Sequence, residues 1–321
     1  MTRRGGGVRS LAGRRVFLTG AAGGIGRALA ERAAAEGAVL LLTDRAADRL
    51  EDTVRSVREA GGTVAYAKAA DVSAYDEVRA LAEEIHAEGG PADVVMNVAG
   101  ISTWGTVEML EHRHWRDVVE VDLMGPIHVI ESFLPAMIAA RRGGHLVNVS
   151  SAAGLIGLPW HAPYSAAKFG LRGVSEVLRF DLRRHRIGVT LVCPGAVATP
   201  LADTVEIVGV DRDSPAARRL RARFLKRAAS PEEVATTILD GMRRGRYLIH
   251  TSRAIHVLHA LQCLAPPLYV LAMRAWNRVA QRVLGAAVAR SGEKTTGPGS
   301  GSGPGSGPGS GPAAVRVGGV R

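Results

Sequence analysis

Aromatic residues make up only 4% of this 321-residue chain, and it contains only two cysteines. Base stacking needs aromatic side chains among basic ones, and no basic stretch here contains them. We therefore expect no nucleic-acid partner, despite a net charge of +11. Cys193 and Cys263 lack metal-ligand spacing, and Cys193 follows an apolar stretch where a buried reduced thiol is expected. These scarcities predict no metal site and a cytoplasmic location.

A secretory pattern is also missing, since residues 1–15 are rich in arginine and glycine and contain no apolar run. Hydrophobic residues at 46% and charged residues at 22% are ordinary for a globular protein. The length suits one large α/β domain with appendages. The composition predicts a flexible N-terminus at 1–12, a folded domain at 13–253, a helical extension at 254–290 and a disordered Gly/Ser/Pro tail at 291–321.

Seven short apolar segments alternate with segments of helical periodicity. This alternation predicts an α/β fold with a doubly wound parallel sheet that helices cover on both faces. In such folds, ligands bind at the carboxyl ends of the strands. The expected strands are 15–19, 39–43, 62–67, 93–97, 145–149, 188–193 and 246–250.

Tyr164 and Lys168 compose a candidate proton-transfer site. Their spacing of four places both on one face of a helix. A cation beside a phenol favours the phenolate, so we expect the pKa of Tyr164 to be drawn down from about 10. Ser151, thirteen residues upstream, can hold the same substrate oxygen by a hydrogen bond. Since Lys168 is one of four lysines beside 37 arginines, a lysine at this position calls for a specific reason.

A glycine turn follows the first predicted strand and precedes a helical segment. Gly20, Gly24 and Gly26 allow the backbone to approach a pyrophosphate at the N-terminal end of that helix. The second strand leads to Asp44, whose carboxylate can accept the ribose hydroxyls of NAD and would repel the 2′-phosphate of NADP. NAD is favoured, although Arg27 and Arg45 keep NADP open.

Together these motifs resemble those of the short-chain dehydrogenase/reductase family, in its subgroup with a Thr-Gly-x-x-x-Gly-x-Gly turn. Residues 19–26 fit that pattern. Asp71-Val72 resembles the family's pair beside the adenine, and residues 97–100 are close to its Asn-Asn-Ala-Gly. Pro194-Gly195 with Thr199 resembles the segment near the nicotinamide. The resemblance covers about residues 13–250.

The resemblance implies an NAD(P)-dependent oxidoreductase that moves hydride between the nicotinamide and a secondary alcohol or ketone. It implies that Tyr164 is the acid/base, that Lys168 lowers its pKa and holds the ribose, and that Ser151 fixes the substrate oxygen. A homodimer or homotetramer is also implied. The cofactor contacts that it implies are Thr19, Gly20, Gly24, Ile25, Gly26, Asp44, Arg45, Asp71, Val72, Asn97, Ala99, Gly100, Tyr164, Lys168, Pro194, Gly195, Val197 and Thr199.

One position departs from the family pattern. Where the family usually carries an Asn that helps to hold a water beside the catalytic Lys, this chain has Asp122. An ionised Asp122 near Lys168 would partly cancel the field that lowers the Tyr164 pKa. The alternative is that Asp122 hydrogen-bonds to the same water as the family's Asn would, with little effect on the Tyr164 pKa.

The segment between Pro200 and Ser230 begins with apolar residues, as does the loop before Tyr164. In the family, the segment between Pro200 and Ser230 covers the substrate as a lid. These apolar residues therefore either form a pocket for a lipophilic substrate or pack within the lid itself. The residues concerned are Leu155, Ile156, Leu158, Trp160, Leu201, Val205, Ile207, Val208 and Val210. A rival interpretation is a nucleotide-sensing or scaffolding protein that kept the fold and lost turnover, but the Ser-Tyr-Lys set is intact.

Residues 254–273 contain no charged side chain and are long enough to span a bilayer. The pair Pro266-Pro267, together with His256 and His259, argues against a spanning helix. From Leu268 onward, the spacing predicts an amphipathic basic helix. It either lies on an anionic membrane at the inner face, or closes the pocket or an oligomer interface.

Overall fold

The computed structural model describes residues 8–292, apart from 212 and 227. The tail expected at 291–321 therefore lies almost entirely outside the described residues. The side chains of Val8 and Leu11 are buried in the core. The packed domain thus reaches back to residue 8, whereas composition places its start at 13.

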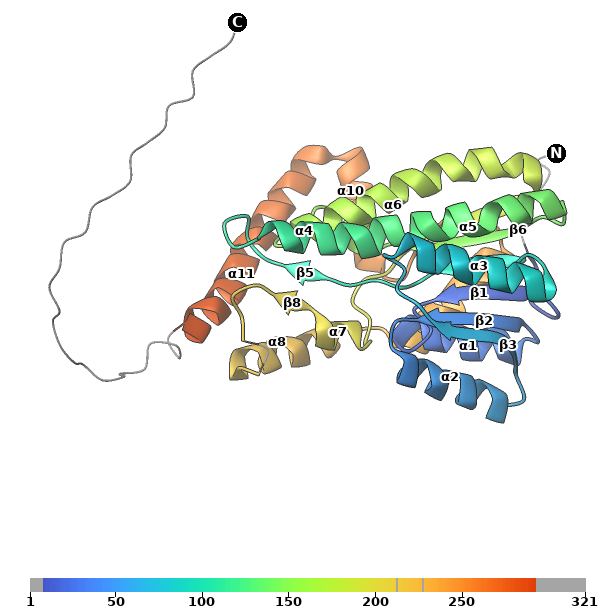
Figure 1. Ribbon diagram of the computed structural model, residues 1–321. Helices are drawn as coiled ribbons and strands as arrows, with labels where there is room; N and C mark the ends of the chain where they lie inside the picture. The colour runs from blue at the N-terminus through green and yellow to red at the C-terminus, as the bar shows by residue number, and fades with distance from the viewer. Residues whose placement is uncertain (1–7, 212, 227, 293–321) are drawn as a thin grey trace, which may run out of the picture.

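A seven-stranded sheet forms the centre of the molecule (Figure 1), with strand order β3-β2-β1-β4-β6-β7-β9. The strands are β1 (Arg15–Thr19), β2 (Val39–Asp44), β3 (Thr63–Ala69), β4 (Val94–Asn97), β6 (Gly144–Val149), β7 (Ile187–Cys193) and β9 (Leu248–His250). All neighbouring pairs are parallel. Each strand overlaps the segment predicted for it, so the doubly wound parallel fold is confirmed.

Helices connect the strands and extend the chain beyond the sheet. Within the described residues they are α1 (Gly24–Ala35), α2 (Ala47–Glu59), α3 (Tyr75–Gly89), α4 (His112–Val119), α5 (Gly125–Ala140), α6 (Ala162–Asp181), α7 (Leu201–Thr204), α8 (Pro215–Leu225), α9 (Pro231–Arg243), α10 (Arg253–Leu264) and α11 (Pro266–Gly292). The predicted extension is broken between α10 and α11 at Ala265, next to the two prolines, so residues 254–273 do not form one spanning helix.

The helices pack on both faces of the sheet, because successive strand residues point to opposite sides. In β1, Val16 and Leu18 belong to the core that α1, α2 and α9 cover. Phe17 lies between them and faces α3 and α5, where its ring stacks on Phe133 with centroids 4.0 Å apart. Figure 1 shows α1 and α2 on one side of the sheet and α3 and α5 on the other.

A second, two-stranded sheet was not expected from the sequence. It pairs β5 (Thr103–Trp104) with β8 (Glu206–Ile207) in parallel. Two-residue strands are too short to show an alternation of apolar and polar residues, so periodicity could not reveal them. The pairing ties the segment after Pro200 to the loop that follows β4.

One described helical run, His112–Ala140, is long and apolar enough by composition to cross a membrane, since an 18-residue window within it has a mean hydropathy of 1.5. It comprises α4, a π-helical turn η1 (Glu120–Met124) and α5. Val129, Phe133 and Met137 of this run are buried against the sheet. Its apolar character is therefore explained by core packing.

Candidate active site

The turn after β1 brings the backbone into close contact with the loop after β4. Gly20 has a φ of +70°, and a Cβ there would lie 2.8 Å from the amide nitrogen of Ala99. A Cβ on Gly26 would lie 2.0 Å from the carbonyl oxygen of Gly20. Thr19 secures the contact, since its Oγ1 accepts hydrogen bonds from the amides of Val98 (3.0 Å) and Ala99 (3.1 Å). Only glycine fits these two positions. No side chain of the described residues caps the start of α1, so the first amides of that helix can receive a phosphate.

A cavity of about 1270 Å³ begins at this turn and reaches α11. Sixteen of the predicted cofactor residues line it, so the residues present fit a dinucleotide. These residues are Gly20, Gly24, Ile25, Gly26, Asp44, Arg45, Asp71, Val72, Ala99, Gly100, Tyr164, Lys168, Pro194, Gly195, Val197 and Thr199.

Thr19 and Asn97, also predicted as cofactor contacts, lie beneath the cavity wall and are buried. Asn97 Nδ2 donates to Asn148 Oδ1 (2.9 Å), and Asn148 Nδ2 donates to Ser175 Oγ (2.9 Å). Ser175 in turn donates to the carbonyl oxygen of Leu171 in α6 (2.7 Å). This chain of hydrogen bonds joins β4 and β6 to α6, so Asn97 supports the helix that carries the catalytic candidates.

Acidic and basic side chains lie close together in the part of the cavity where the sequence predicts the ribose and the adenine. Asp44 accepts hydrogen bonds from the amides of Ala22 (3.0 Å) and Ala46 (2.9 Å), which fixes its carboxylate beside the glycine turn. Arg45 lies 3.8 Å from Asp71. Burial raises the pKa of Asp71, but two hydrogen bonds from Ser73 and the charge of Arg45 outweigh it, and the pKa lies below its usual value. Arg49, which the sequence did not single out, also lines this part of the cavity.

Ser151, Tyr164 and Lys168 meet in the cavity, as predicted. Ser151 follows β6 and caps a short 3₁₀ helix, η2 (Ala152–Gly154), by accepting from the amide of Ala153 (3.1 Å). Tyr164 and Lys168 lie on α6, with the Lys168 nitrogen 5.6 Å from the centre of the Tyr164 ring. Lys168 Nζ also donates to the carbonyl oxygen of Val149 (3.2 Å).

Asp122 forms an ion pair with Lys168 behind the cavity wall. Its Oδ2 lies 3.1 Å from Lys168 Nζ, and its Oδ1 accepts from the amide of Ile101 (2.7 Å). Both charged side chains are almost wholly buried. The π-helical turn η1, which carries Asp122, interrupts the run of α4 into α5 at this point.

This geometry favours the ionised form of Asp122. Each carboxylate oxygen faces a donor, and within the described residues Oδ2 has no acceptor for a carboxylic proton. Burial raises the pKa of Asp122 above its ordinary value, and Lys168 and the Ile101 amide reduce that rise without cancelling it. Burial lowers the pKa of Lys168, but Asp122 and Tyr164 together outweigh it and hold the pKa above its ordinary value. Lys168 therefore stays an ammonium.

The expected lowering of the Tyr164 pKa is wrong for this arrangement. Burial disfavours the phenolate and raises the pKa, while Lys168 opposes that rise. Asp122 raises the pKa further, and a hydrogen bond with Ser151 lowers it. The net pKa of Tyr164 lies above its ordinary value, because burial disfavours the phenolate and the negative charge of Asp122 offsets part of the opposing field of Lys168.

We call the part of the cavity beyond Tyr164 its substrate half. Sequence analysis missed several residues there or anticipated them only in part. His161 lies in the cavity between Trp104 and Tyr164, with ring centroids 4.4 Å and 6.3 Å away. Burial lowers the pKa of His161 to about 4, so the ring is neutral. Of the nine predicted apolar pocket residues, four line the cavity: Ile156, Leu158, Leu201 and Val205. The other five do not: Leu155, Trp160, Ile207, Val208 and Val210. The position of His161 three residues before Tyr164 was the available signal.

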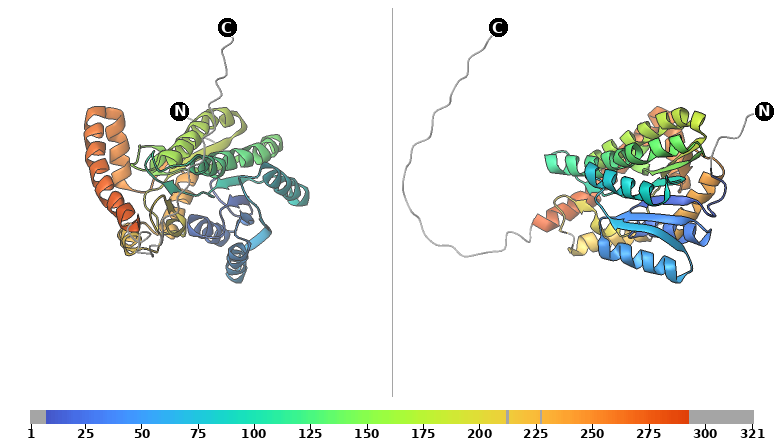
Figure 2. Two further views of the ribbon diagram at one scale, coloured as in Figure 1. Left: turned by 60° about the vertical axis from the view of Figure 1, so that its left-hand side comes forward. Right: turned by 45° about the vertical axis from the view of Figure 1, so that its right-hand side comes forward.

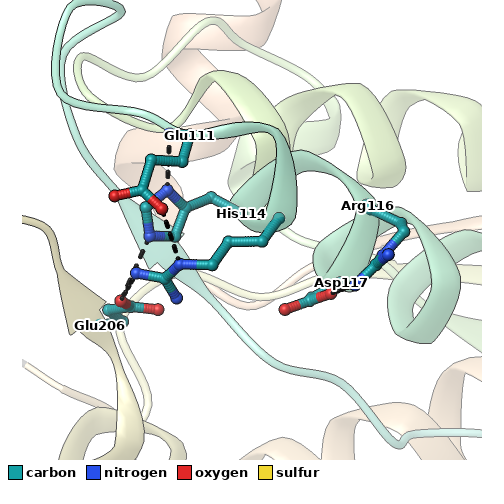
Figure 3. A network of polar contacts seen from close by, with 6 residues as sticks. Glu111, His114, Arg116, Asp117 and Glu206 are labelled. Carbon is teal, nitrogen blue, oxygen red and sulfur yellow. Dashed lines mark hydrogen bonds and ion pairs between the residues drawn. The ribbon is translucent and has the colours of Figure 1, made fainter.

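A polar network holds the substrate half to the rest of the fold (Figure 3). Glu206 of β8 accepts from Arg113 Nη2 (3.3 Å) and lies 3.3 Å from His114 Nε2. His114 Nδ1 accepts from the amide of Glu111 (2.8 Å), so a neutral His114 carries its proton on Nε2 and donates to Glu206. Glu206 also lines the cavity. The network fixes β8, and with it the first part of the segment between Pro200 and Ser230, against α4.

Comparisons with known proteins show to which family the chain is similar. A family model described as short chain dehydrogenase matches residues 14–207. A putative oxidoreductase, SadH, from Mycobacterium tuberculosis is 36% identical over 243 residues, which cover 74% of this chain and 86% of that protein. A putative ketoacyl reductase from Streptomyces coelicolor is 35% identical over 252 residues, which cover 76% and 95%.

Solved structures show the same likeness. A short chain dehydrogenase/reductase from Burkholderia phymatum in complex with NAD has a TM-score of 0.74 and 30% identity, over 81% of this chain and 96% of that one. Solved relatives hold NAD or NADP. The chain therefore belongs to the short-chain dehydrogenase family, as an oxidoreductase that acts on CH–OH donors with NAD or NADP.

Proposed function

We propose that this enzyme transfers hydride between the nicotinamide and a secondary alcohol or ketone carbon of a lipophilic molecule of steroid-like, retinoid-like or fatty type. The observation that carries the substrate class is the wall of the cavity beyond Tyr164. Apolar side chains from four separate parts of the chain converge there: Trp104, Ile156, Leu158, Leu201, Val205, Trp276, Val279 and Val283. An apolar surface of this extent favours an apolar substrate, because burial removes it from water.

The side chains at the inner end of the cavity suit proton exchange at the substrate oxygen. Tyr164 would take the hydroxyl proton in oxidation and return it in reduction, while Ser151 donates a hydrogen bond to the same oxygen. Lys168 favours the phenolate through its charge. The glycine turn would hold the pyrophosphate, and Asp44 the ribose. The nicotinamide, when bound, supplies the hydride chemistry.

NAD is the proposed cofactor of preference, since the fixed carboxylate of Asp44 stands where a 2′-phosphate would be repelled. We expect Asp44→Asn to improve kcat/KM with NADP relative to NAD by about tenfold or more, because it removes a charge but keeps an acceptor for the Ala22 amide. Asp44→Ala should show the same change with weaker binding of both cofactors. An unchanged NAD/NADP ratio in both variants would place Asp44 away from the ribose.

A homodimer or homotetramer in the cytoplasm, or at the inner face of the membrane, completes the proposal. The membrane part rests on the extension at 254–290. The family generally takes small-molecule substrates and forms oligomers, but the size of this assembly is proposed only from that resemblance.

A catalytically weak nucleotide-binding protein is the second candidate. The raised pKa of Tyr164 supports it, since a phenol that resists ionisation is a poor base. Such a protein would bind NAD or NADP without measurable turnover of any alcohol.

A screen of the purified chain against steroid, retinoid and aliphatic secondary alcohols, with NAD and with NADP, tests both candidates. We expect kcat/KM to rise with apolar size, by roughly fourfold for each methylene that becomes buried, which corresponds to about 0.8 kcal/mol. A preference for small polar alcohols would contradict the apolar substrate. Cofactor binding with no turnover across the panel would favour the second candidate.

A further inference from the structure

The hairpin of α10 and α11 stands at one side of the molecule, with its turn at the end away from α8 (Figure 2). Large apolar side chains around this turn are open to solvent. Leu264 is 85% exposed, Leu268 57%, Val270 44% and Leu271 61%. Four neighbouring exposed apolar side chains at one tip exceed the scattered apolar residues that a protein surface normally carries.

The hairpin is purely basic. Residues 253–292 include five arginines and neither Asp nor Glu. Arg274, Arg278 and Arg282 are four positions apart, so they form a stripe along α11, and all three are exposed. Within the described part of the chain, none of these three guanidinium groups has a carboxylate partner. The stripe is therefore available to an anionic surface.

The arginine stripe and the cavity lie on opposite sides of α11. Trp276, Ala280 and Leu284 line the cavity and are also four positions apart. At about 100° per residue, this stripe and that of the arginines differ by roughly half a turn of the helix. Leu271 falls on the arginine side. The outer face of α11 can therefore make contacts while its inner face keeps the cavity wall in place.

We propose that the tip around Leu264, Leu268 and Leu271, together with the arginine stripe, docks on a membrane that contains anionic phospholipids. The apolar tip would enter the boundary between headgroups and acyl chains, and the arginines would contact the headgroups. A second copy of the chain fits less well. A two-fold interface would bring the same arginines toward each other, with no carboxylate on the hairpin to neutralise them.

Docking would place the open side of the cavity at the lipid surface. Trp276, Val279 and Val283 line the cavity, yet they are 44%, 57% and 39% exposed. An apolar substrate dissolved in the bilayer would meet these side chains first. This consequence rests on the proposed apolar substrate, whereas the docking itself does not.

Co-sedimentation of the full chain with vesicles tests the docking. Vesicles of phosphatidylcholine alone are compared with vesicles that also contain phosphatidylserine, each at low and high salt. We expect tight binding only to the second kind, weakened by salt. Arg274→Gln/Arg278→Gln/Arg282→Gln should lower that binding by about 100-fold. Leu268→Ser/Leu271→Ser should lower it by about tenfold or more.

Tyr75→Ser is the matched control, because Tyr75 is 43% exposed and begins α3, which lies at the opposite end of the molecule from the hairpin (Figure 2). It should bind vesicles like the wild type. All variants should keep wild-type turnover of a short soluble alcohol without vesicles, so loss of docking is distinguishable from failure of the enzymatic proposal. Absence of wild-type binding to anionic vesicles, or unchanged binding in either hairpin variant, would overturn the docking. A smaller oligomer in the leucine variant would make the hairpin an interface between copies instead.

Discussion

Replacing Tyr164 by Phe is expected to lower kcat by about 10²- to 10⁴-fold, while the dissociation constant for NAD changes little. The substitution removes one oxygen, and that oxygen is the proposed proton-exchanging group of the cavity. Ser151 and Lys168 remain in place, because Ser151 is held by the Ala153 amide and Lys168 by Asp122 and Val149. Cofactor binding should persist, since the glycine turn and Asp44 are untouched.

Tyr247→Phe provides the matched control. Its hydroxyl oxygen is buried and has no hydrogen-bond partner in the described part of the chain, and the residue does not line the cavity. Stopped-flow or steady-state rates with saturating cofactor should therefore be those of the wild type for Tyr247→Phe only. A Tyr164→Phe enzyme that keeps more than about a tenth of the wild-type rate would remove Tyr164 from the proton-transfer role.

Asp122→Asn is expected to move the pH profile of alcohol oxidation to lower pH. Oxidation needs the phenolate, so its rate rises as pH passes upward through the Tyr164 pKa. Removing the charge of Asp122 lets the field of Lys168 act more fully on Tyr164, and its pKa falls. The rising part of the profile therefore shifts downward in pH.

The same substitution should also reduce the free energy of unfolding, by about 1–3 kcal/mol. An amide in this place must turn its NH₂ toward either the Ile101 amide or the Lys168 ammonium, which are both donors. Urea unfolding measures this loss. Asp117→Asn is the control, because Asp117 is an exposed carboxylate that pairs only with its neighbour Arg116 in the described residues. An upward shift of the pH profile, or an unchanged one, would show that Asp122 does not act as a charge beside Lys168.

Local sequence patterns were sufficient for the sheet and for the edge at which the site lies. Short apolar strands and a glycine turn are encoded by neighbouring residues, and parallel pairing then gathers the carboxyl ends of the strands. Gly20, Asp44, Ser151 and Pro194 lie at the carboxyl ends of separate strands and line one cavity for that reason. The prediction that Tyr164 and Lys168 lie on one face of a helix likewise needed only their spacing and the geometry of a helix.

The remainder depends on contacts that no local pattern contains. Asn97 was expected at the cofactor, but its amide is engaged by Asn148, which lies 51 residues away. The direction of the Tyr164 pKa depends on burial by several segments and on Asp122. Likewise, Glu206 meets His114 across 92 residues. Each of these is a tertiary contact, and its effect follows only once the distances are known.

Transfer of deuterium tests the central claim most directly. An apolar secondary alcohol carrying deuterium on its carbinol carbon is incubated with the purified enzyme and NAD or NADP, and the reduced cofactor is analysed by mass spectrometry. The account predicts that deuterium appears in the reduced nicotinamide with the wild type and Tyr247→Phe, and falls to background with Tyr164→Phe. Label transfer by Tyr164→Phe at the wild-type rate, or none by the wild type from any apolar secondary alcohol while the cofactor binds, would contradict it.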